Sequence, residues 1–202
     1  HPILHSFPTR RSSDLLFLLI FVSGCAKPAP AATSGKLRVV STVSPITNII
    51  QNVGGDRIDV TGIVPEGVNS HTFEPAPSDA RLLAQADIIF VNGLLLEEPT
   101  IKLAEANKAE GVEIVSLGEQ TVTPAEYVFD FSFPKEAGNP NPHLWMNPRY
   151  AARYAELVAE SLAVADPANA DFYRANSAAF AERIDALDKA ITATAATIPA
   201  EN

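Results

Sequence analysis

Short apolar segments rich in β-branched residues alternate along this chain with segments that carry apolar residues at helical spacing. The first pattern is typical of buried strands, and the second is typical of helices that cover a sheet. Repeated strand–helix units predict a parallel sheet with right-handed crossovers, so the expected fold class is α/β. The expected strands lie at residues 37–43, 58–64, 88–91 and 112–117, and two of the expected helices lie at 46–53 and 97–108.

Two further helices carry recognisable start signals. Ser78 is expected to be the N-cap of a helix that contains Leu82, Leu83 and Ala86 on one face. Asn147 is expected to cap a second helix, because a proline in the first turn and a regular apolar stripe follow it.

The last expected helix is unusually long. It covers residues 167–198 and would extend roughly 45 Å at the α-helical rise per residue. A small α/β lobe does not need a cover of that length. We therefore interpret residues 36–165 as an N-terminal α/β lobe and 166–199 as an inter-lobe helix, with a second lobe expected beyond residue 202.

The start of the chain predicts an exported lipoprotein. Residues 1–15 fit no later pattern and resemble translated adapter sequence, so we interpret them as non-native. The apolar run that follows is shorter than the about 20 residues of a membrane-spanning helix, which predicts a truncated signal peptide over 16–24. Cys25 ends a lipobox-like Ser-Gly-Cys and is expected to carry a lipid, with 25–35 as a membrane tether. The alternatives are an unmodified thiol and an ordinary disordered terminus.

Charge and cysteine content narrow the range of functions. The formal net charge is −9, which disfavours binding to a nucleic-acid backbone. The chain has one cysteine, so an intrachain disulfide is impossible, and an acylated cysteine would leave no free thiol. Any bound metal would therefore depend mainly on histidine and carboxylate ligands.

Two histidines are the candidate metal ligands. His71 follows the second expected strand, and His143 precedes the helix that Asn147 caps. Ligands of open parallel sheets bind at the carboxyl ends of the strands, where both loops are expected to lie. Neutral imidazole binds zinc and other first-row divalent ions. Each histidine taken alone is better explained as an ordinary solvent-facing or hydrogen-bonded loop residue, because nothing in their spacing pairs them.

Three segments resemble a known family. They are GGDRIDVTGIVPEGVNSHTFEPAPSD at 54–79, ADIIFVNGLLLE at 86–97 and NPHLWMNP at 141–148. They are similar to the metal-binding receptors of ABC transporters, the zinc/manganese receptor family, which is also called the lipoprotein adhesin family. The resemblance covers about residues 36–202 and implies a periplasmic-binding-protein-like fold of two lobes joined by a long helix. It also implies that the metal lies between the lobes, that His71 and His143 are the N-terminal ligands, and that the other ligands lie beyond residue 202.

The chain departs from the family pattern near the second histidine. Asp usually precedes the Pro-His pair, and this chain has Asn141, which keeps a carbonyl acceptor but loses a charge. Asn141 and Glu74 are the residues that we expect to support the ligands. Many zinc-type members have a His-rich loop, whereas residues 118–142 contain no histidine, which favours manganese or iron. Zinc receptors without such a loop also exist in the family, so the expected transported metal is zinc or manganese.

The sequence thus predicts a monomeric extracytoplasmic lipoprotein that captures a divalent transition metal and delivers it to an ABC permease without catalysing a reaction. Two alternatives stay open. A His-dependent metallohydrolase would need a general base, and Glu74 is the one carboxylate near a ligand in sequence. An adhesion module would need an exposed apolar or aromatic patch.

Overall fold

A parallel sheet lies at the centre of the computed structural model, which describes residues 35–199. Within that range the strands follow the order β2-β1-β3-β4, and every neighbouring pair is parallel. The expected α/β class is therefore confirmed. The strands are β1 (Leu37–Ser41), β2 (Ile58–Gly62), β3 (Ile88–Val91) and β4 (Ile114–Ser116).

Three of the four strands are shorter than the sequence pattern predicts. The expected strands at 37–43 and 58–64 each lose two residues at the carboxyl end. Pairing nevertheless continues there, because the N–H groups of Ile63 and Val64 donate to the carbonyls of Ser41 and Thr42 at 2.9 Å. The expected strand at 112–117 is reduced to β4.

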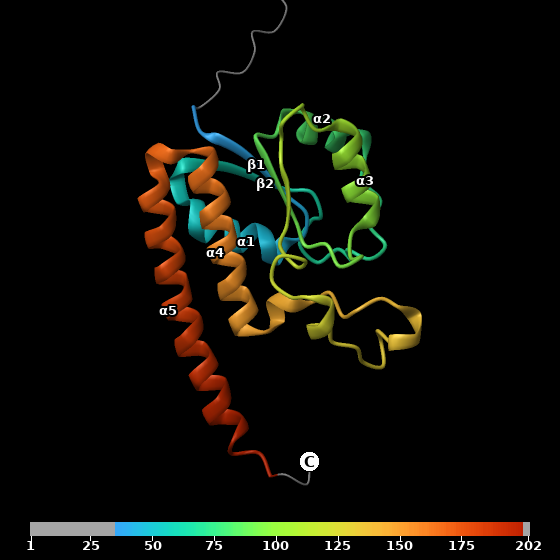
Figure 1. Cartoon of the computed structure of the whole chain (residues 1–202), viewed down its shortest axis with the longest axis vertical. Coiled ribbons are helices and arrows are strands. Elements are labelled where there is room, and N and C mark those ends of the chain that lie inside the picture. The colour runs from blue at the N-terminus through green and yellow to red at the C-terminus, as the bar shows by residue number, and fades with distance from the viewer. Residues whose placement is uncertain (1–34, 200–202) are drawn as a thin grey trace, which may run out of the picture. The chain divides into compact units, whose positions relative to one another are not determined.

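Helices cover both faces of the sheet, as Figure 1 shows. Side chains along β3 alternate between the two faces. Phe90 packs in the apolar cluster formed with α1, α4 and α5, and Ile89 packs in the smaller cluster formed with α2 and α3. The helices are α1 (Ser44–Gly54), α2 (Pro77–Gln85), α3 (Glu98–Asn107), α4 (Pro148–Ala165) and α5 (Ala170–Ala195). In the part of the chain that the structure describes, five short 3₁₀ turns lie between them, at Gly55–Arg57, Pro124–Glu126, Lys135–Ala137, Leu144–Met146 and Pro167–Asn169.

The start of α2 differs from the prediction, and the expected cap at Ser78 is wrong. Ala76 is the N-cap, Pro77 occupies the first helical position, and the Asp79 carboxylate accepts the Ala76 N–H at 2.8 Å. Proline is favoured at the first helical position, because its fixed φ suits the helix and its missing N–H has no partner there anyway. The helix ends at Gln85, so Ala86 follows it as the C-cap. The expected Asn147 cap of α4 is confirmed, since its side chain accepts the Arg149 N–H at 3.0 Å.

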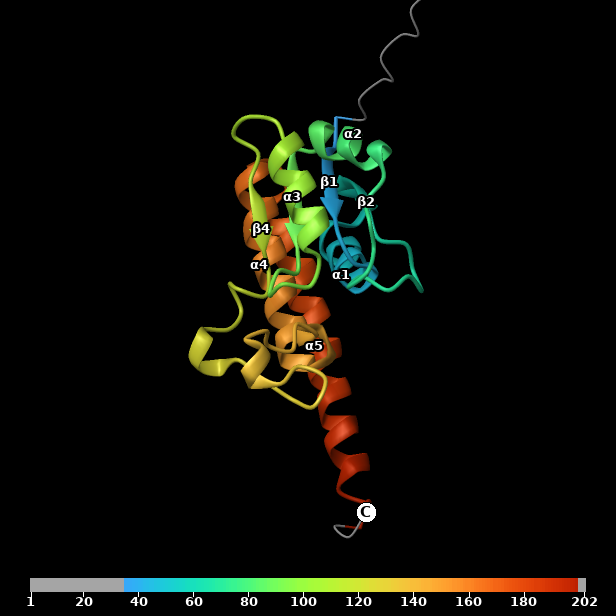
Figure 2. The same cartoon turned by 90° about the vertical axis from the view of Figure 1, so that its right-hand side faces the viewer.

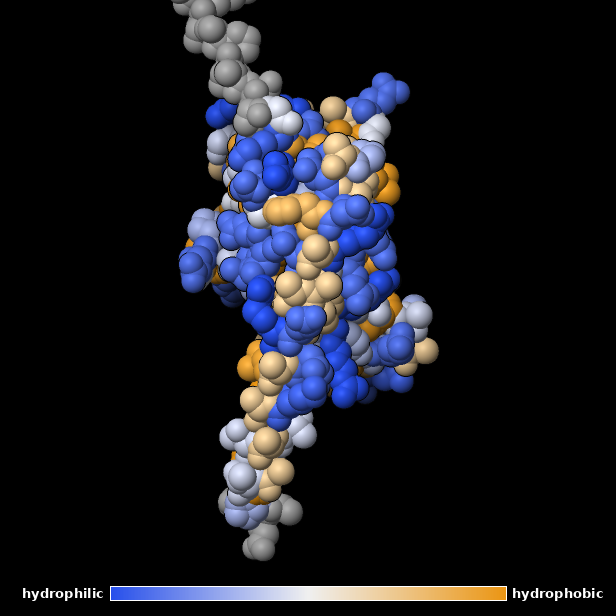
Figure 3. Space-filling model, turned by 90° about the vertical axis from the view of Figure 1, so that its left-hand side faces the viewer, coloured by the Kyte–Doolittle hydropathy of each residue, from blue (hydrophilic) through white to orange (hydrophobic). Residues whose placement is uncertain are grey.

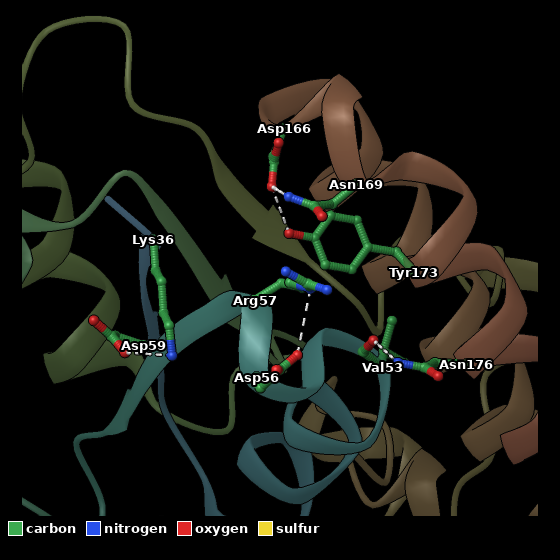
Figure 4. A network of polar contacts seen from close by, with 9 residues as sticks. All are labelled: Lys36, Val53, Asp56, Arg57, Asp59, Asp166, Asn169, Tyr173 and Asn176. Carbon is green, nitrogen blue, oxygen red and sulfur yellow. Dashed lines mark hydrogen bonds and ion pairs between the residues drawn. The ribbon is translucent and has the colours of Figure 1, made fainter. Parts of the chain in front are cut away.

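Polar contacts fix the first half of α5 against the lobe (Figure 4). The Asn176 amide donates to the Val53 carbonyl near the end of α1 at 2.9 Å. Asp166, just before the helix, accepts from the Asn169 amide at 2.6 Å and from the buried Tyr173 hydroxyl at 2.8 Å. The helix therefore starts as part of the lobe.

The second half of α5 leaves apolar side chains in solvent. Leu187 and Ile191 on this half, and Ile198 just after it, are about half exposed. The face of the molecule that α5 lines is otherwise largely hydrophilic (Figure 3). The helix is shorter than the predicted 167–198 at both ends, because its first turn is the 3₁₀ turn Pro167–Asn169 and its last helical residue is Ala195. No helix within residues 35–199 is both long and apolar enough to cross a membrane.

The strands point toward the segment that links β4 to α4. Figure 2 shows the arrowheads of β1 and β4 directed at this segment, which contains residues 117–147. The loop from β2 to α2 also leaves a carboxyl end of the sheet. The predicted non-native segment, signal peptide, Cys25 and almost all of the tether lie outside the described residues and stay predictions.

Candidate metal site

The structure brings the two predicted histidines together. His71 lies in the loop between β2 and α2, and His143 immediately precedes the 3₁₀ turn Leu144–Met146. Their Nε2 atoms are 3.2 Å apart, and their ring centroids are 5.2 Å apart. The two histidines are 72 residues apart in the sequence, so their proximity is a result of the fold and could not be read from their spacing.

The distance between the two nitrogens suits a shared metal ion. Zinc–imidazole bonds of 2.0–2.1 Å at a tetrahedral angle place two ligand nitrogens about 3.3 Å apart. Without an ion, one Nε2 of the pair must carry a hydrogen to donate to the other. The arrangement of the two rings therefore fits two of the ligands of one divalent ion.

Asn141 determines which nitrogen of His143 carries the hydrogen. Its side-chain oxygen lies 3.0 Å from the His143 backbone N–H and 2.8 Å from His143 Nδ1. Because that oxygen can only accept, Nδ1 is the protonated nitrogen, and Nε2 presents its lone pair. Asn141 thus contacts both the backbone and the ring of His143 and leaves the lone pair of Nε2 available, while its support of a metal ligand stays a prediction.

Burial lowers the pKa of His143, and the neighbouring His71 lowers it further, while Asp130 acts in the opposite direction. Half-buried imidazole favours its neutral form, since burial disfavours the charged one. His143 is therefore poised as a neutral ligand near pH 7.

Aromatic rings enclose the pair. Phe133 lies 5.8 Å from the His71 ring and 5.5 Å from the His143 ring, and Trp145 lies 5.3 Å from His143. Trp145 also packs on the main apolar cluster. Phe73, two residues after His71, packs against both apolar clusters. Phe133 was not identified from the sequence, because it lies in a segment without periodicity.

Asn92, at the carboxyl end of β3, holds the segment that carries His143. Its buried amide donates to the Pro142 carbonyl at 3.0 Å. Its side-chain oxygen accepts the hydroxyl of the buried Tyr154 at 2.8 Å. The core of the lobe therefore fixes the backbone immediately before His143.

Glu97 in turn holds Asn92. The Thr42 hydroxyl and the Asn92 N–H each donate to its carboxylate at 2.6 Å, and the Gly93 N–H donates at 3.2 Å. Burial raises the pKa of Glu97, and these donated hydrogen bonds oppose that rise. The site thus rests on a buried acid that sequence reasoning placed only at the start of a helix.

The remaining expected residue, Glu74, is not brought to the pair. It is exposed and makes no hydrogen bond with either histidine. Within residues 35–199, no three or more His, Cys, Asp or Glu side chains gather as a metal-binding group. Each histidine lines a hollow: one of about 200 Å³ is lined by His71 and Phe133, and one of about 630 Å³ by Asn141 and His143.

Comparison with known proteins finds a family model that matches most of this chain. The family described as zinc-uptake complex component A, periplasmic, matches residues 39–202. The manganese ABC transporter substrate-binding lipoprotein PsaA of Streptococcus anginosus is 38% identical over 203 residues, which cover 93% of this chain and 61% of that protein. The metal ABC transporter substrate-binding lipoprotein FimA of Streptococcus parasanguinis is 36% identical over 177 residues, which cover 85% and 56%.

Solved structures show the same fold. A manganese-bound periplasmic metal binding protein from Candidatus Liberibacter asiaticus is 32% identical, with a TM-score of 0.63 over 73% of this chain and 53% of that one. The periplasmic zinc binding protein TroA from Treponema pallidum is 24% identical, with a TM-score of 0.74 over 83% and 58%, and shows likeness of fold alone. The chain thus spans between half and two thirds of the length of each of these four proteins.

Proposed function

Because the chain belongs to the family described as zinc-uptake complex component A, periplasmic, we propose that it captures a divalent transition metal outside the cytoplasm and delivers it to an ABC permease. One observation carries the proposal: the Nε2 atoms of His71 and His143 lie 3.2 Å apart, with Asn141 fixing the metal-binding tautomer of His143. The transported ion is zinc or manganese. The names of the curated relatives and the absence of histidine from residues 118–142 favour manganese.

Two imidazoles fill half of a tetrahedral coordination shell. We propose that the second lobe expected from the sequence supplies the remaining ligands. The greater length of the curated relatives supports this proposal. The 202-residue chain should accordingly bind metal more weakly than a longer protein that includes the second lobe.

We also propose that a lipid on Cys25 anchors the protein, as a monomer, to the outer side of the cytoplasmic membrane. The lipobox-like sequence and the word lipoprotein in the names of the relatives support this part. A hydrolase would need a general base within hydrogen-bond reach of a metal-bound water, and the position of Glu74 gives that alternative no support. The adhesion alternative stays a prediction.

Metal affinity of histidine variants tests the proposal. Isothermal titration of the full chain with Zn²⁺ and with Mn²⁺ at pH 7.5 should give one site. His71→Ala and His143→Ala should each lower the affinity more than the about 10–100-fold that loss of an outer-shell partner causes. His5→Ala is the matched control, since this histidine lies in the segment interpreted as non-native. Undiminished affinity in either of the first two variants would refute the site.

A further inference from the structure

Asp130 receives three hydrogen bonds in the segment between β4 and α4. Its Oδ1 accepts the backbone N–H groups of Ser132 at 2.8 Å and Phe133 at 3.0 Å. Its Oδ2 accepts the side-chain amide of Asn141 at 2.7 Å. An ionised carboxylate is an acceptor only, so three donors around it form a consistent set. These hydrogen bonds also lower the pKa of Asp130, with the Asn141 contact as the largest cause.

The surroundings of Asn141 allow a single orientation of its amide. The Asp130 carboxylate can only accept, so it must face the amide nitrogen. The backbone N–H of His143 can only donate, so it must face the amide oxygen. His143 Nδ1 contacts the same oxygen and must therefore be protonated.

We propose that Asp130 is a positioning residue for metal capture: it fixes the Asn141 amide so that His143 is held with its Nε2 lone pair directed at His71. This inference rests on the proposed function, and it explains how a chain with asparagine before the Pro-His pair keeps the ligand oriented. The partner of a metal-binding imidazole normally sets its tautomer and ring orientation. Here that task is divided between Asn141, which touches the ring, and Asp130, which orients Asn141.

The same carboxylate also places the aromatic cover of the site. Asp130 and Phe133 exchange two backbone hydrogen bonds, at 3.0 and 3.2 Å, in addition to the contact with Oδ1. The resulting turn directs the Phe133 ring toward both imidazoles. One oxygen of Asp130 therefore shapes the wall of the site, and the other sets the tautomer of a ligand.

The variant Asp130→Asn separates these two roles. An amide at this position that keeps its oxygen toward the backbone N–H groups would turn its nitrogen toward Asn141. The Asn141 amide would then reverse in part of the molecules, giving up the hydrogen bond from the His143 backbone N–H and directing its nitrogen at His143 Nδ1, which would have to accept. His143 would then carry its hydrogen on Nε2, the atom that must bind the metal.

The first test measures the tautomer of His143 by ¹⁵N NMR of the ring nitrogens in the metal-free full chain at pH 8. The original protein should show a protonated Nδ1, and Asp130→Asn should shift His143 toward a protonated Nε2. Glu126→Gln is the matched control, because Glu126 accepts the Thr123 N–H and hydroxyl in the same segment without contacting Asn141. An unchanged His143 tautomer in a folded Asp130→Asn protein would overturn the proposal. This test needs no metal, so failure of the proposed function would not affect its outcome.

The second test uses Zn²⁺ affinity in two backgrounds. Asp130→Ala should lower the affinity by about 10–100-fold when Asn141 is present. Asn141→Asp supplies a carboxylate that accepts with either oxygen, so no orientation is needed. The same Asp130→Ala change should then cost nothing, or raise the affinity by relieving repulsion between two carboxylates. An equal loss in both backgrounds would show a purely structural role and refute the proposal. If circular dichroism shows that Asp130→Asn does not fold, this comparison still tests whether Asp130 is a positioning residue.

Discussion

The loop that carries His71 and the segment that carries His143 reach the same point with different support. His71 is exposed, and its backbone N–H is held by the Asn69 side chain at 3.0 Å. Within the described residues its ring makes no hydrogen bond except the one with His143. His143 is half-buried and is oriented by Asn141, and Asn92 fixes the carbonyl of the preceding residue.

This contrast extends to the hydrogens on the rings. His143 already presents the lone pair of Nε2, so in the metal-free pair His71 must donate from its own Nε2. His71 has to move that hydrogen to Nδ1, or lose it, before it can bind an ion. The comparison teaches that one ligand is pre-organised and that the ordering cost of binding falls mainly on the other.

The largest expected effect comes from removing Glu97, the buried acid that holds Asn92 and, through Asn92, the segment that carries His143. Glu97→Ala leaves the hydroxyl of Thr42 and the N–H groups of Asn92 and Gly93 without an acceptor in the core. We expect the free energy of unfolding to fall by about 3 kcal/mol or more, since each orphaned buried group costs about 1–3 kcal/mol. Chemical denaturation measures this loss. Exposed Glu105 is the control, and its alanine variant should stay within about 0.5 kcal/mol; equal effects of the two variants would contradict the role of Glu97.

Asn92 and Asn69 allow a matched comparison of the segment that carries His143 with the loop that carries His71. Asn92→Ala removes the donor to Pro142 and the acceptor of the Tyr154 hydroxyl in the core, and should cost about 2 kcal/mol of stability. It should also weaken Zn²⁺ binding by about tenfold or more through loss of ligand positioning. Asn69→Ala acts on an exposed loop and should change stability by no more than about 0.5 kcal/mol. Titration of both variants with Zn²⁺ measures whether the His143 segment depends more on its support than the His71 loop does. A larger loss of affinity for Asn69→Ala than for Asn92→Ala would contradict this difference.

The smallest expected effect concerns the pKa of His143 and its contribution to stability. The pKa of His143 is lowered in the folded chain by burial and by His71, so the unfolded state binds a proton first as the pH falls. The stability linked to this group is complete above the unfolded pKa near 6.5 and is lost as the pH falls through the lower folded pKa. NMR titration of the His143 ring should therefore give a pKa below about 6.5. A pKa at or above that value would show that the ring is less shielded than the structure indicates.

The strands and helices were largely predictable from sequence, because their buried apolar residues recur at the spacing that each type of element requires. Phe90 and Ile89 alternate between the two faces of the sheet as a strand buried on both faces requires. The N-cap was misplaced because Ser78 is a good capping residue, whereas the structure uses Pro77 and the Asp79 carboxylate. Local signals of similar strength compete at such ends, and the chain sequence alone did not separate them.

The two histidines could be named from sequence, but their support could not. The contact between Asp130 and Asn141 joins two positions in a segment without periodicity, so no spacing rule indicates it. Glu97 gave no signal either, because glutamate is almost never fully buried and is normally assigned to the surface. Such contacts depend on how the chain closes around the carboxyl end of the sheet.

Titration of Zn²⁺ into the full chain with ¹⁵N-labelled histidine rings tests the central claim most directly. The ring nitrogens of His71 and His143 should shift together along one saturation curve, with Nε2 bound and Nδ1 protonated in both. The resonances of His1 and His5 should not follow that curve. A response of one ring without the other, or of His1 and His5 in their place, would contradict the assignment of His71 and His143 as a joint metal site.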